Sequence, residues 1–323
     1  MKSLDFGRYV LGGSVVAAML AGCGGSQPPI GAPGVMPQSR ATVTHAGRGG
    51  SWMLPTAKSG ELVYASYNFG TTVDVFSYPG GTLVGQLTGF QGPAGLCSDG
   101  SGDVWITNES PPEVIEYQHG GTDPIAILGS EDPFGCSVDP TTGNLAVTNF
   151  NPADIAVYKN ASGNPRYYSS PDFPEWWYCA YDNHGNLFAG SPASSDLAEL
   201  PAGSGTIEAI TLDKSFALGS MQWHKKYLAI ADAGGSADAP ATIYHVSVMG
   251  SNGTVAGKST LNNAGKHREG LAVQYWITGS AIVGPDKLYF NFWRYPKGGR
   301  PTKVIRHLDQ QLWGTTVSIA PGH

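Results

Sequence analysis

Short runs of alternating apolar and polar residues, separated by glycine-rich turns, recur along most of the chain. Residues 73–76 (Val-Asp-Val-Phe) and 114–117 (Val-Ile-Glu-Tyr) are two such runs, and the turn-forming sequences Tyr-Pro-Gly-Gly and Tyr-Gln-His-Gly-Gly end or follow them. A period of two is typical of strands with one buried face, and glycine and proline supply hairpin turns. The pattern predicts many short antiparallel strands.

A second signal repeats with a longer period. The sequence Gly-[Asp/Asn]-aliphatic begins at Gly102, Gly143 and Gly185, which are 41 and 42 residues apart. A repeat of this length built from strands is typical of propellers and solenoids, because one unit cannot bury its own apolar face. The turn markers recur around positions 78, 117, 158, 200 and 295, so the last interval holds two units, one enlarged by a loop near residues 232–240.

These markers predict six units from Leu62 onward, each of about four strands. Residues 62–66 are expected to form a second strand and residues 315–319 a first strand, so the C-terminus would complete the N-terminal unit. The predicted fold class is therefore all-β: a six-bladed β-propeller with four-stranded antiparallel blades, closed by the C-terminal strand joining the N-terminal blade. Seven blades and an open solenoid are the alternatives.

Residues 93–108 carry the pattern Pro-x-Gly-Leu-x-x-Asp-x-x-Gly-Asp-Val-Trp-Ile-Thr-Asn, and residues 134–149 and 178–191 carry looser versions of it. This pattern resembles NHL-type repeats, and the resemblance extends over residues 61–323. It implies a six-bladed propeller related in fold to gluconolactonase-like, strictosidine-synthase-like and paraoxonase-like proteins. Such propellers include interaction modules and metal-dependent hydrolases, so the fold does not decide the function.

The N-terminus has the features of an export signal. Lys2 and Arg8 are followed by a short apolar run over residues 9–20, and the sequence Leu20-Ala21-Gly22-Cys23 resembles the bacterial lipobox. We therefore expect residues 1–22 to be a lipoprotein signal peptide and Cys23 to carry the lipid that holds the protein on a membrane. By the same resemblance, Gly24 implies a cell-envelope location in the outer membrane of a Gram-negative bacterium. A plain signal peptide is the alternative.

Residues 23–60 are rich in Gly, Pro and Ser and are expected to form a flexible tether, with the propeller spanning residues 61–323. Within the tether, residues 51–55 (Ser-Trp-Met-Leu-Pro) are apolar enough that we expect them to dock on the folded domain.

The charge balance argues against a nucleic-acid partner. The chain has 19 Lys and Arg against 25 Asp and Glu, which gives a net charge of −6. Binding to a phosphate backbone requires clustered basic residues. The sequence also lacks a nucleophile-elbow, phosphate-loop or dinucleotide-binding motif.

One face of the disc is predicted to be both acidic and aromatic, by analogy with the loops of such propellers. Asn108, Asn149 and Asp232 occupy equivalent positions there, and Glu109 lies beside the first of them. The resemblance to lactonases implies a calcium ion held by these oxygens in the channel, where it would activate water or an ester carbonyl. The alternative is that each residue caps the turn after its strand. The first unit also lacks the glutamate that such hydrolases use as a ligand.

Aromatic residues recur just before the expected first strands, and most should wedge between blades. They are Phe90, Phe134, Trp177, Phe216 and Trp313. Trp176 is additional and could form a platform for a sugar or peptide, with simple packing as the alternative. His267-Arg268-Glu269 joins a base, a cation and a carboxylate, so it could hold an anionic ligand or exchange protons; a solvated loop is the alternative.

Three cysteines remain after lipidation, all in expected first strands: Cys97, Cys136 and Cys179. Cys97 lies two residues before its aspartate and the others lie three before theirs, which reverses the side-chain direction of Cys97. We expect all three to be small buried residues, because first strands of a propeller are crowded. If a disulfide does form in an oxidising compartment, this spacing favours Cys136 with Cys179.

Together these features predict a lipid-anchored binding or scaffolding module whose ligand is an unidentified protein, carbohydrate or small molecule. A calcium-dependent lactonase or esterase using the same face is the alternative, and a purely structural envelope protein is a third.

Overall fold

The computed structural model describes residues 50–67, 69–191, 195–234, 240–262, 273–286, 289–305 and 312–322. The chain divides into two compact units, residues 1–44 and 45–323, and every described residue belongs to the second. The expected signal peptide and Cys23 therefore lie outside the described residues. The described part has two short 3-10 helices, η1 (Pro55–Lys58) and η2 (Lys159–Ala161), and contains no helix with the length and hydropathy to cross a membrane.

The described unit is built from antiparallel sheets. The first has the order β1-β4-β3-β2-β25 and consists of β1 (Trp52–Met53), β2 (Leu62–Tyr67), β3 (Thr72–Ser77), β4 (Leu83–Thr88) and β25 (Leu312–Ser318). The second contains β5 (Pro93–Ser98), β6 (Val104–Asn108), β7 (Glu113–Tyr117) and β8 (Pro124–Gly129). The third contains β9 (Pro133–Val138), β10 (Leu145–Asn149), β11 (Asp154–Tyr158) and β12 (Arg166–Tyr168).

The remaining strands belong to one twelve-stranded sheet that consists of three antiparallel runs. The first run is β13 (Tyr178–Tyr181), β14 (Leu187–Gly190), β15 (Leu197–Leu200) and β16 (Glu208–Leu212). The second is β17 (Leu218–His224), β18 (Tyr227–Asp232), β19 (Ala241–Met249) and β20 (Asn252–Leu261). The third is β21 (Trp276–Thr278), β22 (Ala281–Asp286), β23 (Tyr289–Arg294) and β24 (Gly298–Ile305). Short parallel pairings of β20 with β16 and with β24 join the runs.

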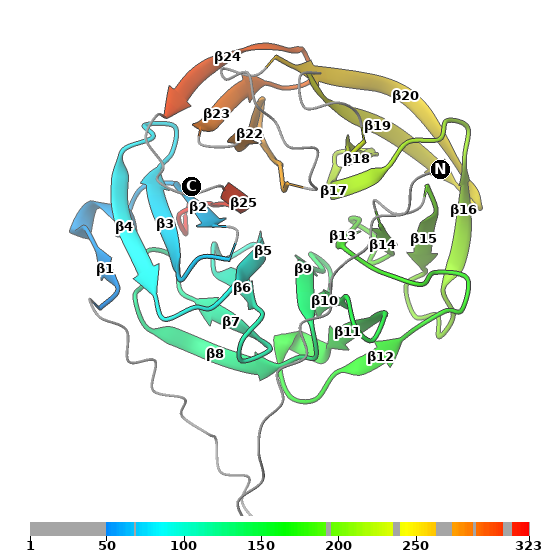
Figure 1. Ribbon diagram of the computed structural model, residues 1–323, viewed down its shortest axis with the longest axis horizontal. Helices are drawn as coiled ribbons and strands as arrows, with labels where there is room; N and C mark the ends of the chain where they lie inside the picture. Colours follow the sequence, from blue (N-terminus) through cyan, green and yellow to red (C-terminus); the bar gives the residue numbers. More distant parts are fainter. Residues whose placement is uncertain are drawn as a thin grey trace, which may run out of the picture. The chain divides into compact units, whose positions relative to one another are not determined.

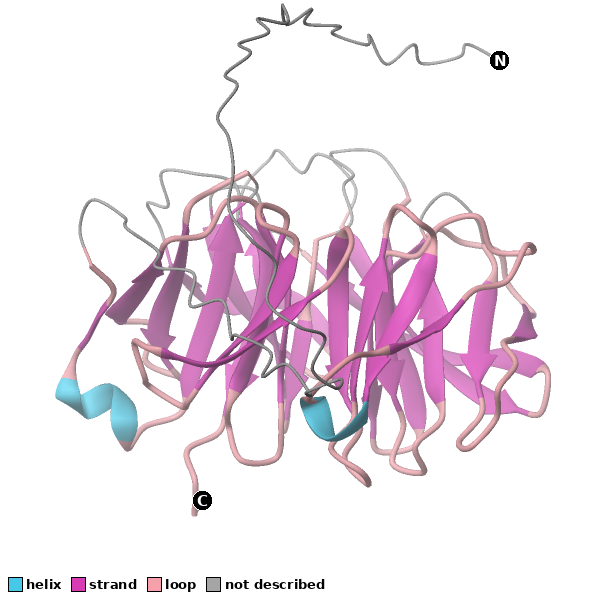
Figure 2. Cartoon of the chain, turned by 90° about the horizontal axis from the view of Figure 1, so that it is seen from below, coloured by secondary structure: helices cyan, strands magenta, loops and turns pink. Residues whose placement is uncertain are grey.

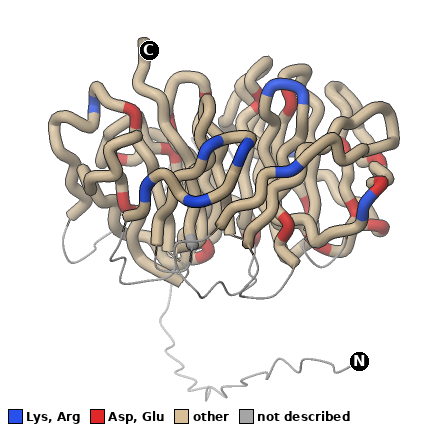
Figure 3. Tube along the Cα trace, turned by 90° about the horizontal axis from the view of Figure 1, so that it is seen from above, with Lys and Arg blue, Asp and Glu red and all other residues tan. Residues whose placement is uncertain are grey.

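The sheets stand side by side around a centre. Figure 1 shows β5, β9, β13 and β17 nearest the middle and β8, β12, β16, β20 and β24 at the periphery. In side view the strands run between the two faces of the disc, and acidic and basic positions are interspersed along its side (Figures 2 and 3). A cavity of about 200 Å³ lies among the inner strands, with Cys97, Cys136, Cys179 and Met221 in its wall. This is the arrangement of a β-propeller.

Two long-range pairings complete the first sheet. The C-terminal strand β25 pairs antiparallel with β2, with Leu62 opposite Ser318. On the outer edge, β1 pairs with β4, with Met53 opposite Gly85. The apolar residues 51–55 therefore dock on the domain as expected, and the sheet begins at Trp52 rather than at residue 61.

Neighbouring sheets approach closely through a repeated contact between a glycine and a carbonyl. A Cβ on Gly314, Gly95 or Gly135 would lie 2.1, 2.4 or 2.5 Å from a backbone carbonyl oxygen of the next inner strand. The same three carbonyls accept hydrogen bonds from hydroxyls of the second strands: Ser66 to Ala94 (2.6 Å), Thr107 to Phe134 (2.8 Å) and Thr148 to Trp177 (2.8 Å). Close approach explains the glycine of the Pro-x-Gly-Leu motif.

The disulfide joins Cys97 to Cys136, and Cys179 is a buried free thiol. The expectation of three free thiols and the conditional pairing of Cys136 with Cys179 are therefore both wrong. Side chains at equivalent positions in successive sheets point in the same direction around the ring. The sulfurs of Cys136 and Cys179 lie 3.9 and 4.0 Å from carbonyls of the preceding sheets, at Trp105 and Ala146. The one-residue offset turns Cys97 toward the following sheet, where it meets Cys136. The reversed side-chain direction of Cys97 is therefore what allows the bridge to Cys136.

Candidate ligand-binding site

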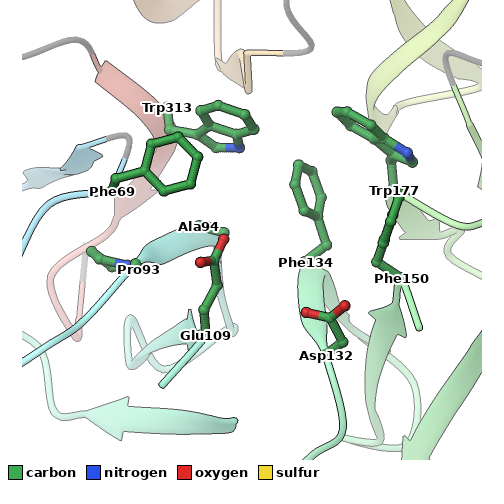
Figure 4. A pocket seen from close by; sticks show the side chains of 10 residues that line it. Phe69, Pro93, Ala94, Glu109, Asp132, Phe134, Phe150, Trp177 and Trp313 are labelled. Atoms are coloured by element: carbon green, nitrogen blue, oxygen red, sulfur yellow. The ribbon is translucent and has the colours of Figure 1, made fainter. Parts of the chain in front are cut away.

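A pocket of about 280 Å³ opens at one end of the inner strands. Its walls come from the first residues of inner strands and from the loops that precede first strands or follow second strands, which is the face predicted to be acidic and aromatic. The lining residues are Phe69, Gly92, Pro93, Ala94, Glu109, Asp132, Phe134, Phe150, Trp177 and Trp313 (Figure 4). The pocket therefore contains five aromatic rings and two carboxylates.

Phe134 stands at the centre of the aromatic group (Figure 4). Its ring centroid lies 4.7 Å from that of Trp177 and 5.7 Å from that of Trp313, with interplanar angles of 55° and 74°. Phe150 meets Trp177 edge to face at 6.0 Å and 77°. Edge-to-face pairs are a favourable aromatic geometry. The rings therefore form walls at steep angles to one another and not one flat platform.

Trp177 is held in place by its surroundings. Its indole Nε1–H donates to Glu175 Oε1 at 3.0 Å, and its backbone N–H donates to the Gly190 carbonyl at 3.0 Å. The same Glu175 oxygen accepts from the Ser191 hydroxyl. These bonds fix the orientation of the ring before a ligand arrives.

Phe69 lies in the loop between β2 and β3 and is 78% exposed. Its φ of 51° is in the left-handed region, which costs a bulky residue about 1–3 kcal/mol. Such strain is concentrated at functional sites, so this conformation supports a role for the pocket in binding.

The two carboxylates occupy the rim beside the rings. Glu109 follows β6 and its carboxylate lies over Gly92, where a Cβ would come within 2.6 Å of Oε2. Gly92 also has a φ of +73°, so two requirements select glycine at this position. Asp132 precedes β9, and its carbonyl accepts from the backbone N–H of Phe150 at 2.8 Å. The Glu109 N–H makes the same contact with the Gly92 carbonyl at 3.2 Å.

The pocket favours positive charge. Partial burial raises the pKa of Glu109, and the neighbouring charge of Asp132 raises it further. Burial also raises the pKa of Asp132. None of the ten lining residues is Lys, Arg or His. A cation in the pocket would therefore relieve the unfavourable environment of both carboxylates.

The oxygens of the predicted ring are each engaged in a separate hydrogen bond within the protein. Asn108 Oδ1 accepts from the Gln91 N–H at 2.8 Å, and its Nδ2 donates to the Pro111 carbonyl. Asn149 Oδ1 accepts from the Ser130 hydroxyl at 2.8 Å. The remaining member, Asp232, accepts from the Gly234 N–H at 3.0 Å.

Each of these oxygens is engaged within the protein, and both asparagines are fully buried. The oxygens of Asn108 and Asn149 bond to the loops before β5 and β9, whereas Asp232 caps the turn after its own strand. Three separate sets of bonds do not fit a shared calcium site of the kind the resemblance implied; the capping alternative describes Asp232 and the amide nitrogen of Asn108.

Trp176 does not form a platform. Its side chain is 0% exposed and stacks on Phe173 with a centroid distance of 5.0 Å, so the packing alternative is correct and the platform prediction is wrong. Of the aromatic residues expected between blades, Phe90 and Phe216 are buried, whereas Phe134, Trp177 and Trp313 are only partly buried and line the pocket. His267-Arg268-Glu269 lies outside the described residues.

Sequence reasoning missed Phe69 and Phe150 as site residues. Phe150 follows the strand-ending Asn149 as Glu109 follows Asn108, and Phe69 lies two residues after Tyr67. Reading one position beyond each strand-ending residue would have found Phe150. Glu109 was named, and it is the one proposed ligand-binding residue of the sequence analysis that lines the pocket.

A separate acidic cluster lies at the opposite ends of the same strands. Oxygens of Asp99, Asp103 and Glu116 lie within 4.8 Å of one another, the only such group of metal-ligating residue types in the described part of the chain. Burial and the two aspartate charges raise the pKa of Glu116 to about 7. Asp99 Oδ1 accepts from the N–H groups of Ser101 and Asp103, so it shapes the turn between β5 and β6.

No family model and no curated protein matches this sequence. Solved structures do share its fold. A chain of a nidogen/laminin complex is 14% identical with a TM-score of 0.62, over 81% of this chain and 100% of that one. A protein of unknown function from Bacteroides caccae is 9% identical with a TM-score of 0.60, over 80% and 99%. At these identities the likeness concerns the fold alone, and with the sheet arrangement it identifies the described unit as a β-propeller.

Proposed function

We propose that this protein is a lipid-anchored, extracytoplasmic β-propeller that acts as a binding module and holds its ligand in the pocket formed by the aromatic rings, Glu109 and Asp132. The single observation that carries this proposal is the pocket itself: five rings and two carboxylates converge on about 280 Å³ at one end of the inner strands. Apolar pockets with a few convergent polar groups are typical of ligand sites.

The scaffold in this proposal is a closed six-bladed propeller of NHL-like repeats. Three separate sheets and three runs of the twelve-stranded sheet supply six groups of four or five strands. The pairing of β25 with β2 supports closure, because it brings the last strand of the chain to the first sheet. The repeated glycine and hydroxyl contacts between inner strands support a regular ring.

The proposed location is the bacterial cell envelope, on the outer membrane in a Gram-negative organism. It rests on the lipobox-like sequence that ends at Cys23. The bridge between Cys97 and Cys136 supports an oxidising compartment, because structural disulfides are rare in the cytosol.

A calcium-dependent hydrolase receives no specific support. The oxygens of Asn108, Asn149 and Asp232 accept separate hydrogen bonds from the protein, at Gln91, Ser130 and Gly234. We therefore assign the face to binding.

A ligand panel tests the proposal. The melting temperature of the full-length protein in detergent is measured in the presence of sugars, amino acids, amines and organic acids. The same measurements are made on two pocket variants, Phe69→Ala and Phe150→Ala. Both rings are exposed, so their removal should leave the fold intact. Tyr167→Ala, at a similarly exposed ring on β12, is the matched control.

We expect at least one compound to raise the melting temperature of the wild type and the control but not of the pocket variants. The proposal fails if no compound depends on the pocket. It also fails if the protein hydrolyses lactones or esters in a reaction that EDTA abolishes and calcium restores.

A further inference from the structure

We infer that the ligand is a compact organic cation, an alkylated ammonium group enclosed by the rings of the pocket and paired with Glu109 and Asp132. This inference rests on the proposed function of the pocket and names the class of ligand that it takes.

The first argument is the hydrogen-bonding character of the lining. Glu109 and Asp132 offer only acceptors when ionised, and neither carboxylate has a cationic or hydrogen-bonding side-chain partner among the described residues. The indole N–H of Trp177 is used by Glu175, and the indole N–H of Trp313 is buried beside Tyr178. The remaining lining side chains are apolar. The pocket therefore attracts positive charge, and the only side-chain donor that its ten lining residues could offer an anion or a sugar oxygen is the buried Trp313 indole N–H.

The second argument is the shape of the aromatic wall. A sugar ring stacks its flat face on one aromatic surface, whereas a rounded cation gains from several rings that surround it. Phe134 meets Trp313 at 74°, and Phe150 meets Trp177 at 77°. Figure 4 shows Trp313 and Phe69 on one side of Phe134 and Trp177 with Phe150 on the other, and the Phe134 ring contacts both indoles. The rings therefore present faces and edges in several directions.

The third argument separates an alkylated ammonium from a primary one. A primary ammonium carries three N–H donors and a guanidinium carries five, and each donor needs an acceptor when it is buried. Here the carboxylate acceptors lie on the rim side, and the other lining side chains offer carbon apart from the two indole N–H groups. Alkyl groups on the nitrogen can face those walls without losing hydrogen bonds. The volume of about 280 Å³ suits a head group better than a larger molecule.

The charges of the pocket agree with this assignment. The pKa values of both carboxylates are raised, because partial burial disfavours their ionised forms. An alkylammonium ion would supply the missing countercharge, and cation–π attraction strengthens as water is excluded. Binding therefore improves the environment of groups that are unfavourably placed in the free protein.

Calorimetric titration of the full-length protein in detergent tests the inference. The probes are choline, its uncharged isostere 3,3-dimethylbutan-1-ol, n-butylamine and glucose. We expect choline to bind saturably and at least tenfold more tightly than each of the others. The variants Glu109→Gln and Asp132→Asn should each weaken choline binding about tenfold, which corresponds to about 1.4 kcal/mol. The control Tyr167→Ala should bind choline as the wild type does.

Binding to free choline is compared with binding to phosphatidylcholine vesicles, and phosphatidylglycerol vesicles are the control. This comparison distinguishes a soluble cation from a lipid head group. Preferential binding of either choline or phosphatidylcholine supports the inference. Equal binding of choline and its uncharged isostere overturns it. The inference is also overturned if choline does not bind and a compound of another class binds in a way that requires Phe69 and Phe150. That result would leave the proposed binding function intact. If no compound binds through the pocket, both proposals fail.

Discussion

Removal of the bridge between Cys97 and Cys136 should destabilise the protein substantially. The bridge links two neighbouring sheets and closes a segment with a sequence separation of 39 residues. For a loop of about 40 residues, chain entropy predicts a stabilisation of about 4 kcal/mol. In a domain of this size about 1 kcal/mol shifts the melting temperature by about 2 °C. The double variant Cys97→Ala/Cys136→Ala should therefore melt about 8 °C below the wild type.

The assay compares thermal and urea unfolding of the wild type, the double variant and Cys179→Ala. Cys179 is buried and free, so its replacement removes one sulfur from the core without opening a covalent link. It should cost about 1 kcal/mol, the value of one buried methylene-sized group. The double variant removes two sulfurs and Cys179→Ala removes one, so subtracting twice the cost of Cys179→Ala from the cost of the double variant isolates the contribution of the bridge.

A thiol count identifies the connectivity independently. If Cys23 is lipidated, the denatured, unreduced protein should show one free thiol, and peptide mapping should place it at Cys179. Three free thiols, or a peptide that links Cys136 to Cys179, would refute the argument from side-chain direction. A double variant that melts with the wild type would refute the entropic estimate.

Three further predictions concern the pocket and the contacts between blades. Glu109→Gln should raise the melting temperature at pH 7 by about 1–2 °C, because the raised pKa means that its charge disfavours the fold; a decrease would contradict this. Choline affinity should be full above the pKa values of Glu109 and Asp132 and fall as the pH is lowered through them, starting above pH 4.5, the ordinary value for a glutamate; a titration in which affinity is constant to pH 4 would exclude pairing with these groups. Gly135→Ala should destabilise by about 3 kcal/mol, since its Cβ would lie 2.5 Å from the Trp177 carbonyl, whereas Gly100→Ala, with open space around it, should be nearly neutral in the same denaturant titration.

Local features of the fold could be predicted from the sequence because they depend on adjacent residues. Gly102, Gly143 and Gly185 mark the turns after first strands, and all three have a positive φ in the structure, at 86°, 71° and 84°. Turns of this kind require glycine whatever packs around them. The repeat spacing therefore located these turns and the strands beside them.

The misplaced residues depend on side-chain direction in irregular backbone. Trp176 and Trp177 are neighbours in a segment without regular pairing before β13, so periodicity does not show which ring enters the core. Only the packing of Trp176 on Phe173 and the bond from Trp177 to Glu175 decide it. The pocket as a whole could not be predicted from the sequence for a similar reason. Its walls come from several sheets, and the placement of these sheets relative to one another depends on the whole ring and not on any one repeat.

The most direct test of the account is to observe the indole N–H signals of the pocket tryptophans by NMR during a choline titration, with assignments from Trp→Phe variants. Trp177 and Trp313 line the pocket, whereas Trp105 and Trp293 are buried elsewhere in the core. The account predicts saturable shifts for the first pair and unchanged positions for the second. Shifts confined to the core pair, or no saturable shift at Trp177 and Trp313, would contradict the assignment of this pocket as an organic-cation site.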